Sequence, residues 1–535
     1  MAGAPWLDIA AGIRLVAGLP RYLWRRLDAE GAAALVASQR AQRERVFLQR
    51  LRAVLGTPSH PYRALLRHAG CEYGDVEALT RRDGLEAALG TLYRAGVYLT
   101  VDEFKGRRPV TRGDATIVVN PDRLRGRSVA PVVTASTSGS RGQRTPIPLD
   151  LAAIRLRGIH TGLPLLARGG DRWRTGVWGV PGGSLSTLLQ YAVVGPRPAR
   201  WFVQLDPRDL RMSARYRWSA AAVRWAALAS LAPLPSAIAA PIDEPGPVAR
   251  WMAGELRARR IPHLDTFVSS ALGICEAARA EGLSLEGAQL TLAGEPMTAA
   301  RLRTLERTGI HAVPRYSTVE CGPIGHGCLA PDAPDDLHLF DNLHAVIQPG
   351  PGAPGPLSPD ALLVTTIQPT GPFTALNLSL GDQADLVPRR CGCPLETIGW
   401  SRHLKTVRSF EKLTAGGMTF LDVDVARVLE DVLPSRFGGR PTHYQLVETE
   451  GQDGQPRLRL LVHPSVGAID SATVRSALLE ALAGTGEAER VMALQWQLAR
   501  WLEVERRPPH LTGGGKILHL HRDRPAFQPS GSDVA

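Results

Sequence analysis

The sequence predicts an α/β fold, with a large N-terminal domain built of several subdomains and a small α+β domain at the C-terminal end. Between residues 129 and 308, short β-branched runs alternate with helical patterns, which is typical of folds that alternate strands and helices. From 337 to 386, short apolar runs are separated by Pro and Gly, which indicates an antiparallel subdomain. The residues after 408 contain helical patterns and a pair of strands, in a stretch of ordinary domain size.

The spacing of apolar residues predicts the elements of the first part. Residues 1–90 are predicted to be a helical N-terminal extension, in which Pro58 and Pro61 end the helical pattern of 32–55. The large domain is predicted to cover 91–407. Its predicted strands are 129–134, 175–180 and one within 285–294, and its predicted helices are 151–166, 248–260 and 298–308.

The remaining elements follow from the same patterns. The β-rich subdomain covers about 337–407, with strands predicted at 338–340, 344–347 and 361–366. The small domain is predicted to cover 408–525. Its predicted elements are a helix at 419–433, strands at 444–448 and 457–462, and a helix at 471–483. Residues 526–535 are expected to form a disordered tail.

Composition and charge narrow the class of protein. Of 535 residues, 44% are hydrophobic and 21% are charged, as in folded globular proteins. The 63 basic residues exceed the 51 acidic ones, giving a net charge of +12, but only four of the basic residues are lysines. The arginines are spread along the chain without a basic run that alternates with aromatic residues, so no nucleic-acid partner is predicted. A lysine that persists against this arginine bias is a candidate for a chemical role.

The N-terminal segment indicates no export signal. Residues 6–19 are mostly apolar but include Asp8 and Arg14, and most of the positive charge follows them, the reverse of a signal peptide. No stretch approaches about 18 uninterrupted apolar residues, so stable membrane insertion is not expected. A helix that packs on the body of the protein is the favoured interpretation, and weak contact with a membrane surface is the alternative. The predicted location is the cytoplasm.

A loop rich in glycine and hydroxyl groups is the most informative motif. The segment Thr134-Ala-Ser-Thr-Ser-Gly-Ser-Arg-Gly-Gln-Arg-Thr-Pro146 directly follows a β-branched run. Glycines let backbone N–H groups curl around phosphate oxygens, and hydroxyls add further donors. The segment lacks the residue order of a Walker loop. It predicts a phosphate-binding loop, with an ordinary polar loop as the alternative.

Six segments together resemble those of adenylate-forming enzymes, the acyl-CoA synthetase superfamily, in the same order and at similar spacings. They are Thr137-Ser-Gly-Ser-Arg-Gly-Gln-Arg-Thr145, Ala293-Gly-Glu-Pro-Met297, Tyr316-Ser-Thr-Val-Glu320, Gly381-Asp382, Arg408-Ser-Phe-Glu-Lys-Leu413 with Gly417, and Gly515-Lys516. The branch that the chain resembles most is that of phenylacetate–CoA ligases, which also carry a Cys-x-Cys after the Gly-Asp. The resemblance spans roughly residues 90–525 and does not place residues 1–90.

The resemblance implies an ATP-dependent, AMP-forming ligase of specialised metabolism. A small-molecule carboxylic acid would attack the α-phosphate of ATP, giving an acyl-adenylate and pyrophosphate, and the thiol of coenzyme A would then displace AMP. The implied cofactors are therefore ATP, Mg²⁺ and coenzyme A. A hinge at 408–411 would make the small domain mobile, so that it could serve both steps. The acid pocket is expected from residues 178–183, 267–270 and 293–294.

The resemblance also implies roles for single residues. Glu320 would bind Mg²⁺, a hard cation that prefers carboxylate oxygens, and Tyr316 would stack on adenine. Thr318 would contact the α-phosphate, and Asp382 would accept the ribose hydroxyls. Lys516, on a glycine-rich loop, would neutralise the α-phosphate during adenylation. The β- and γ-phosphates would be held by Thr137, Ser138, Gly139, Ser140 and Gly142. Further nucleotide contacts are expected from Glu295, Ser317 and Arg408. The implied catalytic residues are Thr318, Glu320 and Lys516.

Departures from the family's pattern leave the acceptor open. The chain has Ser140-Arg141 where the family has Thr-Thr, Ser317 where it has Gly, Asn377-Leu-Ser-Leu380 without two arginines, and Val407-Arg-Ser-Phe-Glu411 at the hinge. The loop hydroxyls, Glu320, Asp382 and Lys516 are all present, which favours ATP use. Because the hinge is altered, three alternatives stay open: an acyl-carrier protein as acceptor, another acceptor that is not CoA, and a degenerate, non-catalytic binding module.

Four of the six cysteines form two pairs, Cys321-x₆-Cys328 and Cys391-x-Cys393. Zn²⁺ takes four such ligands tetrahedrally in closed structural sites, and Gly392 allows a tight turn between two of them. We therefore predict a zinc site of these four cysteines, with His326 as the alternative to Cys321. Four reduced cysteines, some of them buried as small hydrophobic side chains, are the competing interpretation.

Overall fold

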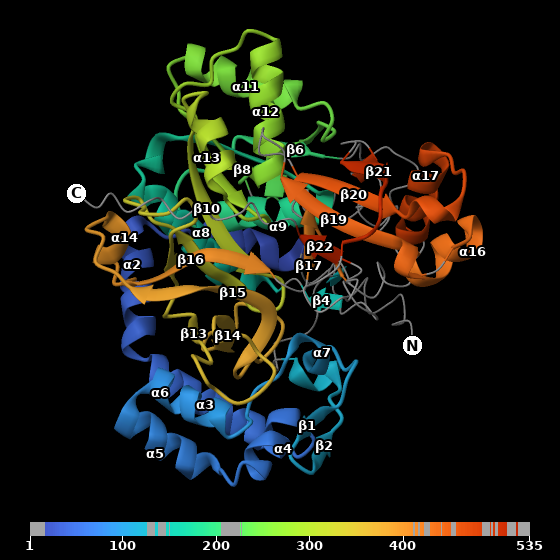
Figure 1. Ribbon diagram of the computed structural model, residues 1–535. Helices are drawn as coiled ribbons and strands as arrows, with labels where there is room; N and C mark the ends of the chain where they lie inside the picture. Colours follow the sequence, from blue (N-terminus) through green and yellow to red (C-terminus); the bar gives the residue numbers. More distant parts are fainter. Residues whose placement is uncertain are drawn as a thin grey trace, which may run out of the picture. The chain divides into compact units, whose positions relative to one another are not determined.

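The computed structural model of the chain forms two compact units, which divide between Glu411 and Lys412 (Figure 1). The first unit contains a long sheet and the N-terminal helices, and the second contains a small sheet with helices of its own. Arg408, expected at the start of the small domain, lies in a strand of the first unit. The structure describes residues 16–125, 134–136, 146–148, 150–204, 225, 227–229, 231–409, 412–415, 418–421, 428–439, 441–450, 456–483, 493, 496–497, 501–510 and 520–522.

One half of a twelve-stranded sheet is parallel, with the strand order β10-β9-β8-β5-β6-β7. Its strands are β5 (Arg174–Gly179), β6 (Arg200–Val203), β7 (Ala237–Ala239), β8 (Pro262–Phe267), β9 (Gln289–Ala293) and β10 (His311–Thr318). The helices of this half are α8 (Leu151–Ala167), α9 (Pro181–Tyr191), α11 (Gly246–Arg257), α12 (Val268–Ala280) and α13 (Ala299–Glu306). This is the α/β architecture that the alternation in sequence predicts.

The other half of the sheet is antiparallel, with the order β13-β14-β15-β16-β12-β11, and β11 joins the halves by pairing with β10. Its strands are β11 (Gly322–Gly327), β12 (Leu337–Leu339), β13 (His344–Ile347), β14 (Ala361–Thr366), β15 (Leu378–Pro388) and β16 (Arg402–Ser409), and the short helix α14 (Pro394–Thr397) precedes β16. The predicted strand 361–366 coincides with β14. The prediction lacks β16, in which Leu404 and Val407 are the only aliphatic residues among charged and polar ones.

Side chains of the parallel strands alternate between two separate cores. Val177 and Trp201 are buried in a cluster with residues of α8 and α9. Trp178 and Phe202, the next residue along each strand, are buried in a cluster with residues of α11 and α12. Because both faces of this half are covered, its chemistry is expected at the strand ends.

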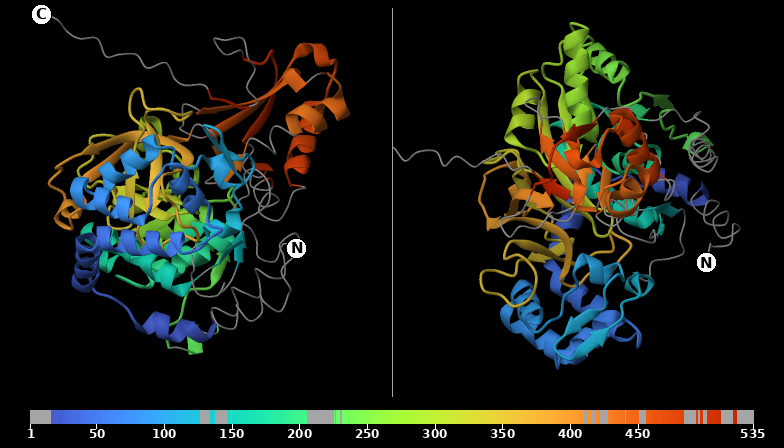
Figure 2. Two further views of the ribbon diagram at one scale, coloured as in Figure 1. Left: turned by 90° about the horizontal axis from the view of Figure 1, so that it is seen from below. Right: turned by 45° about the vertical axis from the view of Figure 1, so that its right-hand side comes forward.

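The N-terminal helices belong to the core of the first unit. They are α2 (Ala29–Ala41), α3 (Arg43–Leu55), α4 (Pro61–His68), α5 (Tyr73–Asp83), α6 (Leu85–Arg94) and α7 (Val101–Phe104), followed by the hairpin of β1 (Val110–Arg112) and β2 (Ala115–Ile117). Phe47 and Leu89 share a buried cluster with Val346 and Leu363 of the antiparallel half. The side-chain amide of Asn377 donates to the Leu89 carbonyl at 2.9 Å. In both views of Figure 2 these blue helices lie against the antiparallel strands.

The second unit is a small α+β module. Its sheet has the order β21-β20-β19-β22, from β19 (Tyr444–Glu450), β20 (Pro456–Val462), β21 (Leu502–Arg506) and β22 (Leu520–Arg522). The unit also contains the hairpin of β17 (Lys412–Ala415) and β18 (Met418–Leu421), and the helices α16 (Leu433–Phe437) and α17 (Ser471–Ala483). The predicted helix over 419–433 is wrong at its start, because Thr419 and Phe420 favour a strand and pair within the hairpin. None of the helices described in either unit has the length and apolar character needed to cross a membrane.

Candidate functional site

The candidate site lies at the carboxyl edge of the parallel half, where β8, β9 and β10 end side by side. The strand order reverses at β5, whose neighbours are β6 and β8. Open α/β sheets bind ligands outside the carboxyl ends of their strands, at such points of reversal. Four predicted site residues end or follow these strands: Glu295 after β9, Ser317 and Thr318 at the end of β10, and Glu320 in the turn after it.

Glu320 is placed by a tight turn between β10 and β11. The backbone N–H of Cys321 donates to Thr318 Oγ1 at 3.1 Å, and Thr370 Oγ1 donates to the Cys321 carbonyl at 2.7 Å. Gly371 packs so closely that a Cβ at this position would lie 2.1 Å from the Glu320 carbonyl oxygen. The turn is therefore fixed by a neighbouring loop, and Thr318 accepts a hydrogen bond within it while its O–H can still donate.

Tyr316 and Asp382 are brought together from β10 and β15. The Tyr316 hydroxyl donates to Asp382 Oδ2 at 2.7 Å, and Asp382 is 7% exposed. Burial and the nearby carboxylate raise the pKa of Tyr316 well above its usual value, so the phenol remains a donor. The pairing of β10 with β11 shifts between Tyr316 and Ser317, a bulge of the kind that redirects side chains. An aromatic ring and a carboxylate thus lie together, the two groups expected for adenine and ribose.

Glu320 is paired with a lysine that the sequence reasoning did not assign to the site. Lys105 Nζ donates to Glu320 Oε1 at 2.7 Å, and the two side chains are 12% and 13% exposed. Lys105 stands at the C-cap of α7, far from Glu320 in sequence. The signal that could have found it is its rarity, because it is one of only four lysines in the chain. The carboxylate of Glu320 suits Mg²⁺, and its charge is balanced here by an ammonium group.

Glu295 lies in a buried polar network at the ends of β8 and β9. Ser269 Oγ donates to Glu295 Oε1 at 2.6 Å. The Arg301 guanidinium is 3.4 Å from Glu295 Oε2, and the glutamate side chain is fully buried. Arg301 also donates to the Pro296 carbonyl at 2.8 Å. This network ties the loop after β9 to α12 and α13. The expected nucleotide contact of Glu295 stays a prediction.

Arg408 is held at the side of β15 that carries Asp382. It lies in β16, which pairs with β15 around Asp382. Its Nη1 donates to Asp335 Oδ2 at 2.6 Å, and the backbone N–H groups of Thr406 and Val407 donate to the same carboxylate. The guanidinium is therefore engaged with Asp335, and a nucleotide contact of Arg408 stays a prediction.

The predicted phosphate loop and the C-terminal lysine belong to the part of the chain that the structure does not describe. Outside the described residues lie Thr137, Ser138, Gly139, Ser140, Gly142, Lys516 and the expected tail 526–535. The two ends of the loop are described, because β3 (Thr134–Ser136) pairs antiparallel with β4 (Pro146–Pro148), with Ser136 opposite Pro146. The predicted loop thus joins two paired strands.

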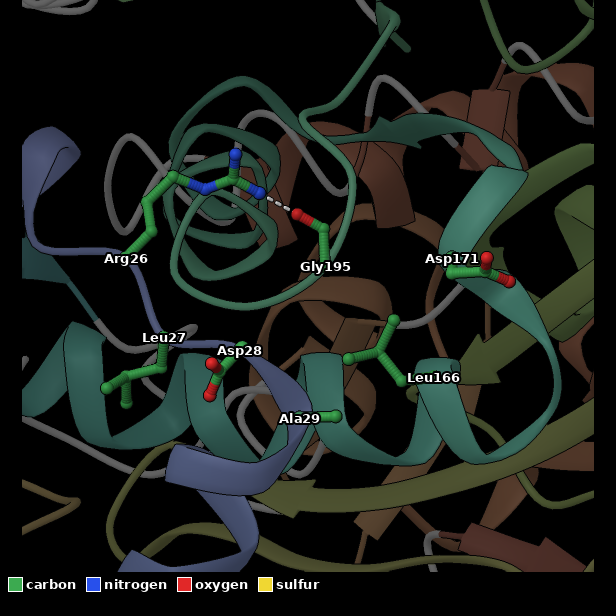
Figure 3. Close-up of a pocket in the computed structure, with 7 residues that line it drawn as sticks. All are labelled: Arg26, Leu27, Asp28, Ala29, Leu166, Asp171 and Gly195. Carbon is green, nitrogen blue, oxygen red and sulfur yellow. Dashed lines mark hydrogen bonds between the residues drawn. The ribbon is translucent and has the colours of Figure 1, made fainter.

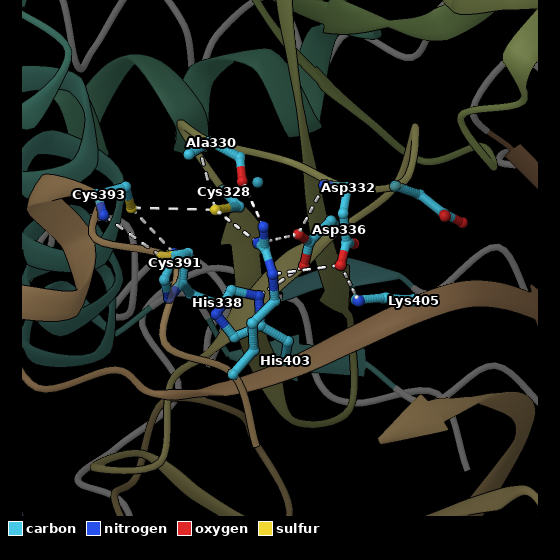
Figure 4. Close-up of polar contacts among 12 residues, drawn as sticks. Cys328, Ala330, Asp332, Asp336, His338, Cys391, Cys393, His403 and Lys405 are labelled. Atoms are coloured by element: carbon cyan, nitrogen blue, oxygen red, sulfur yellow. Dashed lines mark hydrogen bonds and ion pairs between the residues drawn. The ribbon is translucent and has the colours of Figure 1, made fainter. Parts of the chain in front are cut away.

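A second cluster gathers Cys328, His338, Cys391 and Cys393 (Figure 4). Their donor atoms all lie within 4.8 Å of one another. His338 Nε2 is 3.2 Å from Cys393 Sγ and 3.5 Å from Cys391 Sγ, and the sulfurs of Cys328 and Cys393 are 4.0 Å apart. Tetrahedral Zn²⁺ with its usual bond lengths requires S···S separations of about 3.8 Å and N···S separations of about 3.5 Å. The four donors fit such an ion.

Neighbouring groups set the orientation and the protonation of these four side chains. The Trp400 carbonyl lies 2.6 Å from His338 Nδ1, which makes Nδ1–H the donor and turns the Nε2 lone pair toward the sulfurs. Burial lowers the pKa of His338 to about 4, so its ring is neutral at pH 7. The Arg389 guanidinium donates to Cys328 Sγ at 3.4 Å. Burial opposes ionisation of Cys393, but backbone N–H donors around it hold the pKa of that thiol below its usual value.

The predicted ligand set needs a correction at one position. Cys321 is not among the gathered donors, because it is buried in the apolar cluster beneath the antiparallel strands. His326, the alternative, is also outside this group, and its Nδ1 lies 3.2 Å from the Gly327 carbonyl. His338 takes the fourth place because β11 and β12 pair antiparallel, which brings Cys328, just beyond β11, close to a residue of β12. A lone histidine in the strand after that turn was the signal for it.

A pocket of about 690 Å³ lies elsewhere in the first unit (Figure 3). It is lined by Arg26, Leu27, Asp28, Ala29, Leu166, Asp171 and Gly195. The Arg26 guanidinium donates to the Gly195 carbonyl across it. None of the predicted site residues is in this lining, so the pocket is not part of the candidate site.

Comparison with known proteins bears on the fold. No protein-family model and no curated protein matches the chain. A solved 2-hydroxyisobutyryl-CoA ligase, in complex with 2-HIB-AMP and CoA, matches over 91% of this chain and 90% of its own, at 15% identity and a TM-score of 0.52. A second structure of that ligase, in the postadenylation state, matches over 91% and 90% at 13% identity and a TM-score of 0.46. An amide bond synthetase from Marinactinospora thermotolerans matches over 89% and 92% at 14% identity and a TM-score of 0.39. The first of these likenesses shows that the chain shares the fold of that CoA ligase, the adenylate-forming fold that the six sequence segments predict.

Proposed function

We propose that the chain activates a carboxylic acid with ATP through an acyl-adenylate and then transfers the acyl or aryl group to coenzyme A. The observation that carries this proposal is the Tyr316–Asp382 pair beside Glu320 at the carboxyl edge of the parallel strands. Tyr316 offers a ring face to adenine, and Asp382 offers acceptor oxygens to the ribose hydroxyls. The likeness in fold to a CoA ligase supports the same assignment.

The phosphates and the metal complete the proposed site. The loop residues Thr137 to Gly142 hold the β- and γ-phosphates, and Thr318 contacts the α-phosphate. Glu320 is the ligand for Mg²⁺, which when bound neutralises phosphate charge. Lys516 neutralises the charge on the α-phosphate as the carboxylate attacks. Adenylyl transfer depends on such alignment and charge neutralisation more than on covalent help from the protein.

The acid is proposed to bind where the ends of β5, β8 and β9 meet. Trp178 is buried there, and Gln204 Nε2 donates to Ser270 Oγ at 2.8 Å in the segment that begins α12. An aryl or acyl acid would need an apolar pocket with a few fixed polar groups at these strand ends. The phenylacetate–CoA ligase branch and a cytoplasmic location belong to the same proposal. An acyl-carrier protein is the alternative acceptor.

We also propose that Cys328, His338, Cys391 and Cys393 hold a structural Zn²⁺. Three thiolates and one imidazole with no open position form a closed site of the kind that stabilises folds. The cluster joins the β11–β12 turn to the loop before α14. A metal there would therefore fix the antiparallel half on which Asp382 lies.

The test of function is pyrophosphate release with ATP and Mg²⁺ over a panel of aryl and aliphatic acids, each with and without CoA. Acid-dependent release is expected, and AMP release that also requires CoA would identify the acceptor. Lys516→Ala should abolish adenylation while ATP binding is largely kept. Pyrophosphate release without any effect of CoA would favour a different acceptor. The absence of both pyrophosphate release and ATP binding would refute adenylation and favour a non-catalytic binding module.

A further inference from the structure

The ion pair between Lys105 and Glu320 lies at the proposed nucleotide site with both partners largely buried. Its 2.7 Å contact joins side chains that are only 12% and 13% exposed. Withdrawing two charges from water costs free energy that geometry must offset. The chain has 63 basic residues and only four lysines, so its usual cation is arginine. A compact ammonium in place of the usual arginine indicates that its shape and charge matter here.

The position of Lys105 is fixed by the helix α7 and the residues that hold it. The helix α7 begins with a capping box, in which Thr100 and Glu103 each accept a hydrogen bond from the other's backbone N–H. Arg112 donates to both carboxylate oxygens of Glu103, at 2.7 Å and 3.1 Å. Phe104, next to the lysine, is 1% exposed. Such fixed supporting residues are what a precisely placed functional group requires.

The carboxylate partner is equally constrained. Glu320 stands in the turn that Gly371 and Thr370 hold in place. The ammonium group of Lys105 has three N–H donors, and one of them donates to Glu320 Oε1.

We propose that Lys105 is a positioning residue for the metal–nucleotide site. It holds the Glu320 carboxylate in one orientation before nucleotide binds, and so keeps that carboxylate ready for Mg²⁺ and the triphosphate. The inference rests on the proposed function, because it takes Glu320 as the metal ligand. Without the ammonium, the carboxylate loses one of the groups that orient it, and the affinity for Mg·ATP falls.

The test is isothermal titration of the full chain with Mg·ATP, in a double-mutant cycle. Lys105→Met keeps the side-chain length and removes the charge, and about a tenfold loss of affinity is expected. In the Glu320→Gln background the same change should add no further loss, because Lys105 acts through the carboxylate. Lys105→Arg should retain most of the affinity. If thermal melting shows that Lys105→Met is not folded, Lys105→Gln is used instead, and the same loss of affinity is expected.

Lys405→Met is the matched control. Lys405 is also ion-paired, with Asp332 at 2.5 Å, and it lies outside the proposed nucleotide residues, so binding should not change. An equal loss from Lys105→Met in both backgrounds, or no loss in either, would overturn the role of Lys105 alone. A wild-type chain that binds no ATP would overturn the proposed function and this inference together.

Discussion

The two polar clusters of the central sheet differ in how their groups are satisfied. At the end of β10, each group has a partner within the protein, since Tyr316 donates to Asp382 and Lys105 donates to Glu320. In the cysteine cluster, by contrast, the donor atoms face one another, as with His338 Nε2 and Cys393 Sγ at 3.2 Å. Groups that share internal hydrogen bonds can exchange them for a ligand. Sulfur and nitrogen lone pairs that point toward one another are stabilised by a metal ion that remains bound.

The first cluster is therefore suited to binding and releasing a ligand, and the second to holding a structural metal ion. Single substitutions of the nucleotide residues should leave the fold intact and lower the activity, because each residue has a local partner and lies at a strand end. The cysteine cluster should lose stability first, because the metal would link three segments that are distant in sequence: the end of β11, β12 and the loop before α14. Each prediction below tests one side of this contrast, in order of expected effect.

Breaking the cysteine cluster is expected to have the largest effect. Cys393→Ser removes one of four ligands, so the zinc content should fall from about one ion per chain to none. The free energy of unfolding should fall by about 3 kcal/mol or more, because metal binding contributes directly to folding. Metal analysis of the purified chain and denaturant unfolding measure the two quantities.

Cys321→Ala is the control for that experiment. Cys321 is fully buried but is not one of the four gathered donors. The zinc content of the Cys321→Ala chain should therefore equal that of the unchanged chain. Metal retained by Cys393→Ser, or lost from Cys321→Ala, would contradict the ligand set with His338.

The affinity for zinc should fall steeply with decreasing pH, whereas the nucleotide site should not respond in this way. Burial raises the pKa of the Cys328 and Cys391 thiols in the metal-free chain, so both bind a proton at pH 7 when no metal is present. Protons therefore compete with the metal, and lowering the pH favours the metal-free state. Two such thiols predict a loss of about 100-fold in affinity per pH unit. Competition with a chromogenic chelator between pH 8 and 6 measures the slope, and a flat profile would argue against thiolate ligands.

How far the sequence predicts this molecule depends on whether a feature is local. The run 361–366 has four apolar residues followed by two β-branched threonines, and it forms β14 as expected, with every residue buried. The nucleotide motif from Tyr316 to Glu320 is contiguous, so its place at a strand end could be expected as well. The strand β10 escaped prediction, since Pro314 and Arg315 interrupt its apolar pattern.

Features made by pairing distant segments could not be predicted. Lys105 meets Glu320 through the packing of α7 against the sheet, and no spacing in the sequence records this contact. His338 joins the cysteines through the antiparallel pairing of β11 with β12. Cys321 precedes β11 and Cys328 follows it, so the two lie at opposite ends of that strand and in different buried clusters, although they look alike in sequence.

Of the two residues in the Tyr316–Asp382 pair, Asp382 is expected to show the larger effect when changed, in the variant Asp382→Asn. The amide keeps the shape but loses the charge and one of the acceptors for the ribose hydroxyls. A buried, charged hydrogen-bond acceptor contributes strongly to the binding of ATP, so kcat/KM for ATP should fall about 100-fold. The melting temperature should stay close to that of the unchanged chain, in contrast to the cysteine variants. Asp385→Asn, an exposed change on the same strand, is the control and should leave kcat/KM unchanged.

Tyr316→Phe should have the smallest effect, and it separates the ring from the hydroxyl. The ring that would stack on adenine is kept, and only the donor to Asp382 at 2.7 Å is removed. Because a ribose hydroxyl can replace that donor when nucleotide is bound, the loss in ATP affinity should be about fivefold, well below the value of a full charged hydrogen bond. In the Asp382→Asn background the loss should shrink further, since the partner carboxylate is gone. A loss for Tyr316→Phe as large as that for Asp382→Asn would show that the phenol itself contacts the ligand, and the exchange of internal partners for nucleotide would then be the wrong account of this site.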